Sequence, residues 1–256
     1  MKKIGLLRVL QDEETIIPCL ISIAPIMNDV VIIWSEDIAN LSISKAKEWA
    51  PYLESRYGLK LHFAQYPHHV VRPHSIDDLR ILSPENRIDT YVNYGMDITQ
   101  QLYTQDDYLV TKIDSDQVYI RPHFEQALAM VKSPQDAVAI QGYNSLVHYN
   151  GIYLYGARRI NGGGDSLICG QANLLRCGIA PHYEIDIAKH TKTRACPLLC
   201  WMHFMKDFKT RNIIRMFQAN ECLPISTIKE LPNVYTEHIL PHLIEGQSLY
   251  QGLTVG

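Results

Sequence analysis

The chain has 256 residues, 46% of them hydrophobic and 20% charged, so it can bury the core of a large globular domain without disulfides or metals. Its formal net charge is −3 and no run of five like charges occurs, which argues against a nucleic-acid-binding surface and a polybasic lipid anchor. The most apolar window, residues 16–27, is too short for a bilayer span, which takes about 20 residues. Six cysteines and no signal peptide fit reduced thiols, so we expect a soluble cytoplasmic protein that binds no nucleic acid.

The first 120 residues alternate apolar strands with amphipathic helices, as in an open parallel sheet. The continuous β-branched run Val30–Ile33 indicates a strand that is covered on both faces. Gly58 closes one helix, and Ser83 followed by Pro84 opens another. We expect strands at 4–10, 30–34, 59–63 and 108–113, helices at 16–24, 46–57 and 83–102, and a long loop at 64–82.

The second half of the chain is less regular. No repeat or low-complexity linker divides it from the first half, so we predict a single α/β domain. The expected architecture is a mixed sheet flanked by helices, with a helical C-terminal part. We expect a helix near 122–132, short strands between 137 and 155, a glycine-rich turn at 162–164, and helices near 166–177 and 198–218.

Two carboxylates follow the strand expected at 108–113. Asp114 and Asp116 can converge on one cation in the turn beyond the strand, at the carboxyl end where open α/β sheets bind their ligands. Mg²⁺ or Mn²⁺ takes carboxylate and phosphate oxygens together, so such a site would hold a nucleotide diphosphate. The alternative is an acidic turn that only closes the strand.

The order of these features resembles the GT-A-fold nucleotide-sugar glycosyltransferases, particularly the family 2 enzymes. The resembling segments are the opening strand, the turn Gln11-Asp12-Glu13-Glu14, the helix segment Cys19-Leu20-Ile21-Ser22-Ile23, the second strand ending at Asp37, and the later Asp-x-Asp. The resemblance covers roughly residues 4–210. It implies a Rossmann-like GT-A fold, with 1–120 as the nucleotide-sugar-binding half and 121–256 as the acceptor-binding half with C-terminal helices.

The resemblance also implies roles in the donor site. Asp116 would be a metal ligand and Asp114 a contact to the ribose or the metal, while Asp37 and the turn from Arg8 to Glu13 would line the base pocket. Asp37 is followed by Ile38-Ala39-Asn40 rather than by the small residue, Asp and Thr of the family. Glu13 equally suits a helix N-terminus, where the helix dipole favours a carboxylate.

A histidine far downstream is the third metal candidate. His203, within Cys200-Trp201-Met202-His203-Phe204, resembles the aromatic-flanked segment that completes the metal shell in these enzymes. A histidine satisfied within the core is the alternative. Cys196 and Cys200 could instead join His203 in a zinc site, although a fourth ligand at suitable spacing is missing.

The acceptor side is expected between the two metal elements. Asp165, which follows Gly162-Gly163-Gly164, resembles the acidic motif of the family and is the predicted catalytic base for an inverting transfer to an acceptor hydroxyl. Glu184 and Asp186 are the reserve candidates for that base. The alternative for Asp165 is a glycine turn that ends in a helix N-cap.

The resemblance therefore predicts a glycosyltransferase dependent on Mn²⁺ or Mg²⁺. Its donor would be a nucleotide-sugar, a UDP-sugar as the first expectation, and its acceptor a glycan or lipid-linked glycan such as lipopolysaccharide or capsule. A lipid-linked acceptor would bring the protein to the inner face of a membrane without a transmembrane segment.

Three other classes of protein share parts of this pattern. A haloacid-dehalogenase-like phosphatase has the apolar strand followed by Asp-x-Asp, but normally near the start of its chain. A sugar nucleotidyltransferase shares the fold, but its glycine-rich basic loop after the first strand is missing here. A non-catalytic carbohydrate-binding protein is the rival outside the enzymes.

Overall fold

The computed structural model describes residues 1–9, 15–71, 81–104, 107–148, 151–155, 167–171, 175–178, 185–187, 192–204 and 222–224, with single residues at 237 and 241. Its helices are α1 (Ile16–Ile23), α2 (Glu36–Tyr57), η1 (Pro84–Asn86, a 3₁₀ turn), α4 (Ile88–Leu102) and α5 (Arg121–Ala129). Its strands are β1 (Lys2–Arg8), β2 (Asp29–Ser35), β3 (Lys60–Tyr66), β4 (Tyr108–Asp114), β5 (Gln117–Tyr119), β6 (Asp136–His148), β7 (Gly151–Tyr155), β8 (Leu167–Cys169), β9 (Leu175–Cys177), β10 (Ile185–Ile187), β11 (Lys192–Phe204) and β12 (Cys222–Pro224).

One half of the main sheet is parallel, in the order β3-β2-β1-β4. Its two central strands, β1 and β4, are in register from Lys2 with Tyr108 to Arg8 with Asp114, so both strands end at the same level. Every residue of β4 is buried, as expected of a parallel strand that lies between two helical layers.

The other half of the sheet is mixed. β8 pairs antiparallel with both β4 and β6, while β11 runs parallel to β6 and antiparallel to β5. β7 and β12 extend the far edge, so that ten of the described strands form this sheet, and β9 and β10 form a separate two-stranded antiparallel sheet. The larger sheet runs through both the expected donor half and the expected acceptor half of the chain.

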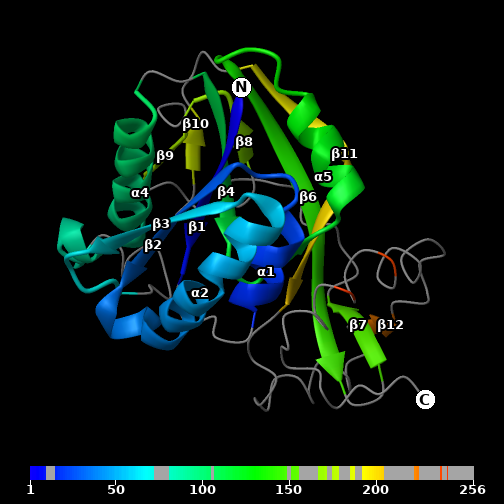
Figure 1. The fold of residues 1–256 in the computed structure, drawn as a ribbon, viewed down its shortest axis with the longest axis horizontal. Helices are drawn as coiled ribbons and strands as arrows, with labels where there is room; N and C mark the ends of the chain where they lie inside the picture. The colour runs from blue at the N-terminus through cyan, green and yellow to red at the C-terminus, as the bar shows by residue number, and fades with distance from the viewer. Residues whose placement is uncertain are drawn as a thin grey trace.

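Helices cover both faces of the sheet (Figure 1). α1, α2 and α5 share one apolar core with one face, and α4 packs on the other face. α4 comes close because of Gly95, where a Cβ would lie 2.7 Å from side-chain atoms of both Ile33 and Leu6. Among the described helices, none combines the length and apolarity needed to cross a bilayer.

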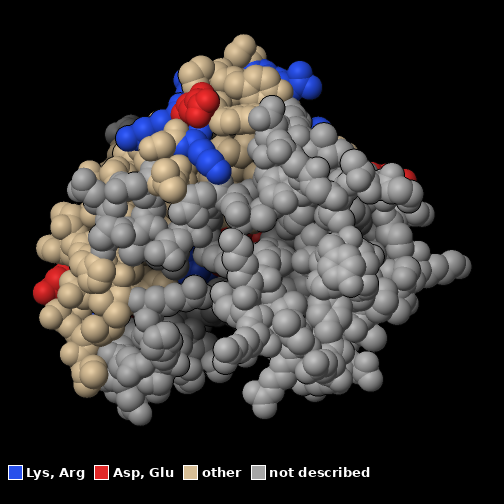
Figure 2. Space-filling view, turned by 90° about the horizontal axis from the view of Figure 1, so that it is seen from below, with Lys and Arg blue, Asp and Glu red and all other residues tan. Residues whose placement is uncertain are grey.

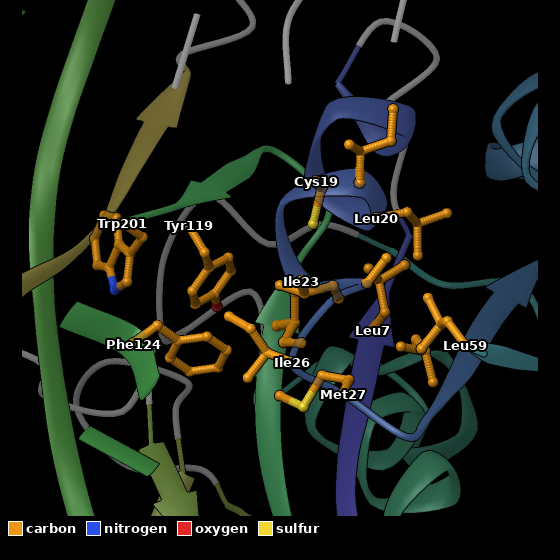
Figure 3. Close-up of a cluster of buried hydrophobic side chains, with 14 of the residues drawn as sticks. Leu7, Cys19, Leu20, Ile23, Ile26, Met27, Leu59, Tyr119, Phe124 and Trp201 are labelled. Carbon is orange, nitrogen blue, oxygen red and sulfur yellow. The ribbon is translucent and has the colours of Figure 1, made fainter. Parts of the chain in front are cut away.

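The larger core joins α1 to the short strand β5 and to β11 (Figure 3). Tyr119 lies among Trp201, Phe124 and Ile23 in this view, and its ring centroid is 4.5 Å from that of Phe124. All four side chains are almost fully buried. This packing fixes β11 against β5. Because β5 directly follows the Asp114–Asp116 segment, β11 is also held next to that segment.

The predicted fold class is confirmed: the chain is α/β, with a mixed sheet flanked by helices on both faces. The strand expected at 108–113 is β4, and the helix expected to close at Gly58 ends there, with Gly58 at φ 73°. The strand expected to reach Asp37 instead ends at Ser35, and Asp37 lies in the first turn of α2.

The helices predicted near 166–177 and 198–218 are wrong wherever the structure describes those residues. β8, β9 and the end of β11 occupy the described parts of these segments. A short apolar run does not distinguish a buried strand from a buried helix. Residues 200–202 of β11 are buried between β5 and β6, which explains why this run lacks the polar alternation typical of a strand.

Gly142 of β6 leaves no room for a side chain. A Cβ there would collide with the ring and the backbone oxygen of Trp201 on the neighbouring strand. We therefore expect Gly142→Ala to lower the free energy of unfolding by about 1–3 kcal/mol, the usual cost of overpacking. Chemical denaturation measures this. Gly178→Ala, at a glycine with open space around its Cβ position, is the matched control, and an equal loss there would contradict the explanation.

Candidate functional site

The candidate site begins at the turn Ser115-Asp116, which joins the carboxyl end of β4 to β5. β1 starts at the top of Figure 1 and β6 ends at the bottom, so Figure 2, seen from below, looks onto the side where the parallel strands end. Atoms of Lys or Arg and of Asp or Glu are visible deep in the middle of that view. Charged groups therefore reach this side of the sheet from within the fold.

Hydrogen bonds to β1 and α1 hold this turn and the strands beside it in place. Ser115 Oγ donates to the backbone oxygen of Arg8 at 3.0 Å, and the thiol of Cys19 lies 3.6 Å from the backbone oxygen of Asp114. The backbone N–H of Tyr119 donates to Ser22 Oγ at 3.0 Å. The helix segment that carried the family resemblance thus has a physical role, because Cys19 fastens α1 to the end of β4 and Ser22 fastens it to the end of β5.

Asp114 is enclosed by two cations. Its Oδ1 lies 2.7 Å from Arg8 Nη2 and its Oδ2 lies 3.3 Å from Lys112 Nζ. Lys112 and Asp114 are two residues apart on β4 and so share one face, and Arg8 is the register partner of Asp114 on β1. The Lys112 side chain is only 3% exposed. Two positive charges therefore flank this carboxylate, which makes it an unattractive ligand for a further dication.

Asp116 meets a different partner. Its Oδ2 lies 2.9 Å from Nε2 of His203, a residue 87 positions later in the chain. The pairing of β5 with β11 produces this approach, since His203 is the register partner of Gln117, the residue after Asp116. The Asp116 side chain is 12% exposed and that of His203 is 30% exposed, so both reach solvent at the sheet edge.

The Asp116–His203 pair fits two neighbouring positions on a divalent cation. Ligands at right angles on an octahedral ion, each about 2.1 Å from it, lie about 3 Å apart, close to the observed separation. A carboxylate oxygen and an imidazole nitrogen suit Mn²⁺ and, through the oxygen, Mg²⁺. Within the described part of the chain no cluster of three or more His, Cys, Asp or Glu side chains could hold a metal. Phosphate oxygens and water would have to fill the other positions.

Tyr119 holds the side chain of Gln117, the residue after Asp116 and the register partner of His203. Its hydroxyl donates to Gln117 Oε1 at 2.9 Å, and Gln117 lies opposite His203. Burial, followed by the nearby thiol of Cys19 and carboxylate of Asp114, raises the pKa of Tyr119 well above its usual value. The phenol therefore stays neutral and keeps its proton for this hydrogen bond.

The other predicted site residues are less well described. Glu13, Asp165 and Glu184 lie outside the described residues. Asp37 lies in α2 and Asp186 in β10, and their side chains are likewise not described. Their roles remain predictions.

The zinc alternative is not supported by the described residues. Cys196 and Cys200 lie near each other, with their sulfurs 4.0 Å apart, but His203 pairs with Asp116. No described group of three such side chains brings the thiols and an imidazole together. The two sulfurs therefore need another explanation.

Sequence reasoning missed Lys112, Ser115 and the anchoring role of Ser22. A lysine inside an otherwise apolar strand, two residues before an aspartate, was the available signal for the first, because residues two apart on a strand share a face. The bonds of Ser115 and Ser22 depend on which strands and helices become neighbours. No local pattern encodes them.

Comparisons with known proteins give similarity of shape only. No protein-family model and no curated protein matches the chain. HddC from Yersinia pseudotuberculosis in complex with GMP-PN has a TM-score of 0.41 at 9% identity, over 94% of this chain and 99% of that one. The inositol-1-phosphate CTP transferase from T. maritima has 0.40 at 8%, over 85% and 95%. A protein described as a glucose-1-phosphate thymidylyltransferase from Bacillus anthracis has 0.36 at 10%, over 68% and 72%.

Ser22→Ala tests the anchoring of the turn. The change leaves the buried N–H of Tyr119 without its acceptor, so we expect the free energy of unfolding to fall by about 1–3 kcal/mol. Thr99→Val is the control. It also removes a buried hydroxyl, but that hydroxyl only adds a second bond to the Gly95 carbonyl inside α4, so its cost should stay under about 1 kcal/mol. Equal losses by denaturant titration would contradict the anchoring role.

Proposed function

We propose that the protein is a metal-dependent glycosyltransferase that uses a nucleotide-sugar donor. The observation that carries the proposal is the approach of Asp116 and His203 to 2.9 Å, although 87 residues separate them in the chain. They meet at the carboxyl end of a parallel strand, where α/β sheets bind nucleotides. The resemblance to the family 2 enzymes assigns metal binding to the same two residues.

Asp114 and Asp116 have different roles in this proposal. Asp116 and His203 hold Mn²⁺ or Mg²⁺, which when bound neutralises the charge that develops on the departing diphosphate. Asp114, already balanced by Arg8 and Lys112, orients the Arg8 guanidinium and accepts a hydrogen bond from a ribose hydroxyl rather than ligating the metal. Glu13 and Asp37 complete the base pocket.

The acceptor side rests on sequence alone. Asp165 removes the proton of the acceptor hydroxyl as it attacks the sugar, with Glu184 and Asp186 as the reserve candidates. The acceptor is a glycan or a lipid-linked glycan, and the donor is first sought among UDP-sugars.

Nucleotidyl transfer, the activity named for two of the similar solved structures, is the competing assignment. It combines a sugar phosphate with a nucleoside triphosphate and releases pyrophosphate, and the triphosphate needs a glycine-rich or basic cradle. The residues between β1 and α1, 9–15, include no Gly, Lys or Arg. This composition favours glycosyl transfer over nucleotidyl transfer.

The donor is found by thermal stabilisation. UDP-, GDP- and CMP-sugars are screened with and without Mn²⁺, and a ligand at 100 times its Kd should add about 2.7 kcal/mol to the free energy of unfolding. The product then separates the activities: a nucleoside diphosphate or monophosphate released from the nucleotide-sugar supports glycosyl transfer. Pyrophosphate released from a nucleoside triphosphate and a sugar phosphate would contradict it, and sugar binding without turnover would favour a carbohydrate-binding protein.

Asp116→Asn should weaken Mn²⁺ binding in the presence of UDP by about 10–100-fold, because the amide carries no charge. Calorimetric titration of Mn²⁺ measures it. The chain offers a matched control in Asp29, another buried aspartate, which lies 3.0 Å from His62 at the opposite, amino end of the sheet. Asp29→Asn should leave Mn²⁺ binding unchanged. The metal assignment is wrong if Asp116→Asn binds like the unaltered protein, or if both variants lose affinity equally.

Asp165→Asn should leave donor affinity nearly intact while turnover falls by about 10² to 10⁴, because only the chemical step needs the base. Donor titration and an acceptor-saturated rate are measured on the same preparation. Normal turnover would remove Asp165 from catalysis and direct attention to Glu184→Gln and Asp186→Asn. A joint loss of folding and donor binding would show that Asp165 shapes the fold instead.

A further inference from the structure

β11 carries a pronounced bulge directly before the His203 segment. Its register partners on β6 are Ala139 for Ala195 and Gly142 for Trp201, so β11 advances six residues while β6 advances three. The extra residues are taken up within the strand, and the sulfurs of Cys196 and Cys200 lie 4.0 Å apart across them.

Hydrogen bonds pin the bulge on both sides. Gln141 Nε2 donates to the backbone oxygens of Cys196 and Pro197 at 3.1 and 2.8 Å. His123 Nδ1 donates to the oxygen of Leu199 at 2.7 Å. The N–H of Ile120 donates to the oxygen of Cys200 at 2.8 Å. The two sulfurs are therefore held as neighbours by the fold.

The surroundings of the two thiols shift their pKa values in opposite directions. The Cys200 thiol donates to the Cys196 sulfur, and this hydrogen bond lowers the pKa of Cys196 to about 6. The same bond and burial raise the pKa of Cys200. Cys196 is 3% exposed, but its neighbours Ala195 and Pro197 are exposed, so a small molecule has only a short way to reach it. A thiolate just below the surface beside a resolving thiol is the arrangement found in oxidisable cysteine pairs.

We propose that Cys196 and Cys200 form a reversible redox site, in which hydrogen peroxide closes a disulfide across the bulge of β11. The five cysteines whose side chains are described are all reduced in the structure. A disulfide needs its sulfurs about 2.05 Å apart, so closure draws the pair together by roughly 2 Å. This redox chemistry does not require the proposed transferase function.

The reaction balances with peroxide as the oxidant. The Cys196 thiolate attacks one peroxide oxygen, the O–O bond breaks, and the departing hydroxide takes a proton from solvent and leaves as water. Cys196 is then a sulfenic acid. The Cys200 sulfur attacks it and forms the S–S bond, while the hydroxyl group leaves with the Cys200 proton as a second water. The sulfurs lose two electrons, the peroxide gains them, and a dithiol reductant reverses the change by exchange.

The test treats the reduced full chain with equimolar peroxide, blocks remaining thiols by alkylation and digests with trypsin. Cleavage after Arg194 and Lys206 places both cysteines in one peptide, 195–206, and Cys169 in another, 160–176. We expect the first peptide to escape alkylation, to be lighter by two hydrogen atoms, and to regain both thiols with dithiothreitol. Cys169, also buried but with its pKa raised to about 12 by burial, is the internal control and should react at least about 10-fold more slowly.

A second measurement follows the backbone and Cys196 itself. Hydrogen exchange should change in residues 196–203 on oxidation and stay unchanged in β4. Cys200→Ser should stop the reaction at a Cys196 sulfenic acid, which dimedone traps. The proposal is overturned if both cysteines remain fully alkylated after peroxide, if Cys169 oxidises as fast as Cys196, or if exchange in the bulge does not change. All three outcomes need only the unaltered protein, so they hold even if the Cys200→Ser variant fails to fold.

Discussion

The Ser115-Asp116 turn is the constraint on which the candidate site depends. A two-residue connection that carries a buried carboxylate has no regular hydrogen-bond partners of its own, so neighbouring elements must supply them. β1 supplies the oxygen of Arg8 for Ser115, and α1 supplies Ser22 for the N–H of Tyr119. Because these contacts come from the sheet and from a helix packed on it, the position of the turn is determined by the core of the fold.

The alternation of side chains between the two faces of a strand determines which charged groups surround each carboxylate. Lys112 and Asp114 share a face of β4, and the register of β1 adds Arg8 to the same face. Asp116 lies in the turn after β4, where side chains no longer alternate between two faces, and it lies beside His203 of β11 instead. The two carboxylates therefore have different surroundings: Arg8 and Lys112 flank Asp114, whereas His203 lies beside Asp116. The second carboxylate is therefore the one to which the proposed function assigns the divalent cation.

Sequence reasoning reached the elements that local patterns encode. The buried strand before Asp114 and the helix ending at Gly58 were predictable because continuous apolar runs and a C-terminal glycine have direct physical causes. The approach of His203 to Asp116 was anticipated only through a family resemblance, since it depends on β5 pairing with β11. The strands β8, β9 and β11 were mistaken for helices because their short apolar runs fit both periods. The salt bridges of Arg8 and Lys112 with Asp114 and the bulge in β11 follow from register, which no single segment specifies.

β11 shows how apolar packing can control a polar site. His203 is carried to Asp116 by β11, and that strand is positioned by Trp201, which fills the space left by Gly142 and packs near Tyr119. The bulge ends just before Trp201, and His203 follows two residues later on the same strand. The Asp116–His203 separation lies within the narrow range that suits one cation, and a displacement of even 1 Å would take it outside that range. The bulge that holds the two thiols adjacent therefore lies directly before the strand segment that brings His203 to Asp116.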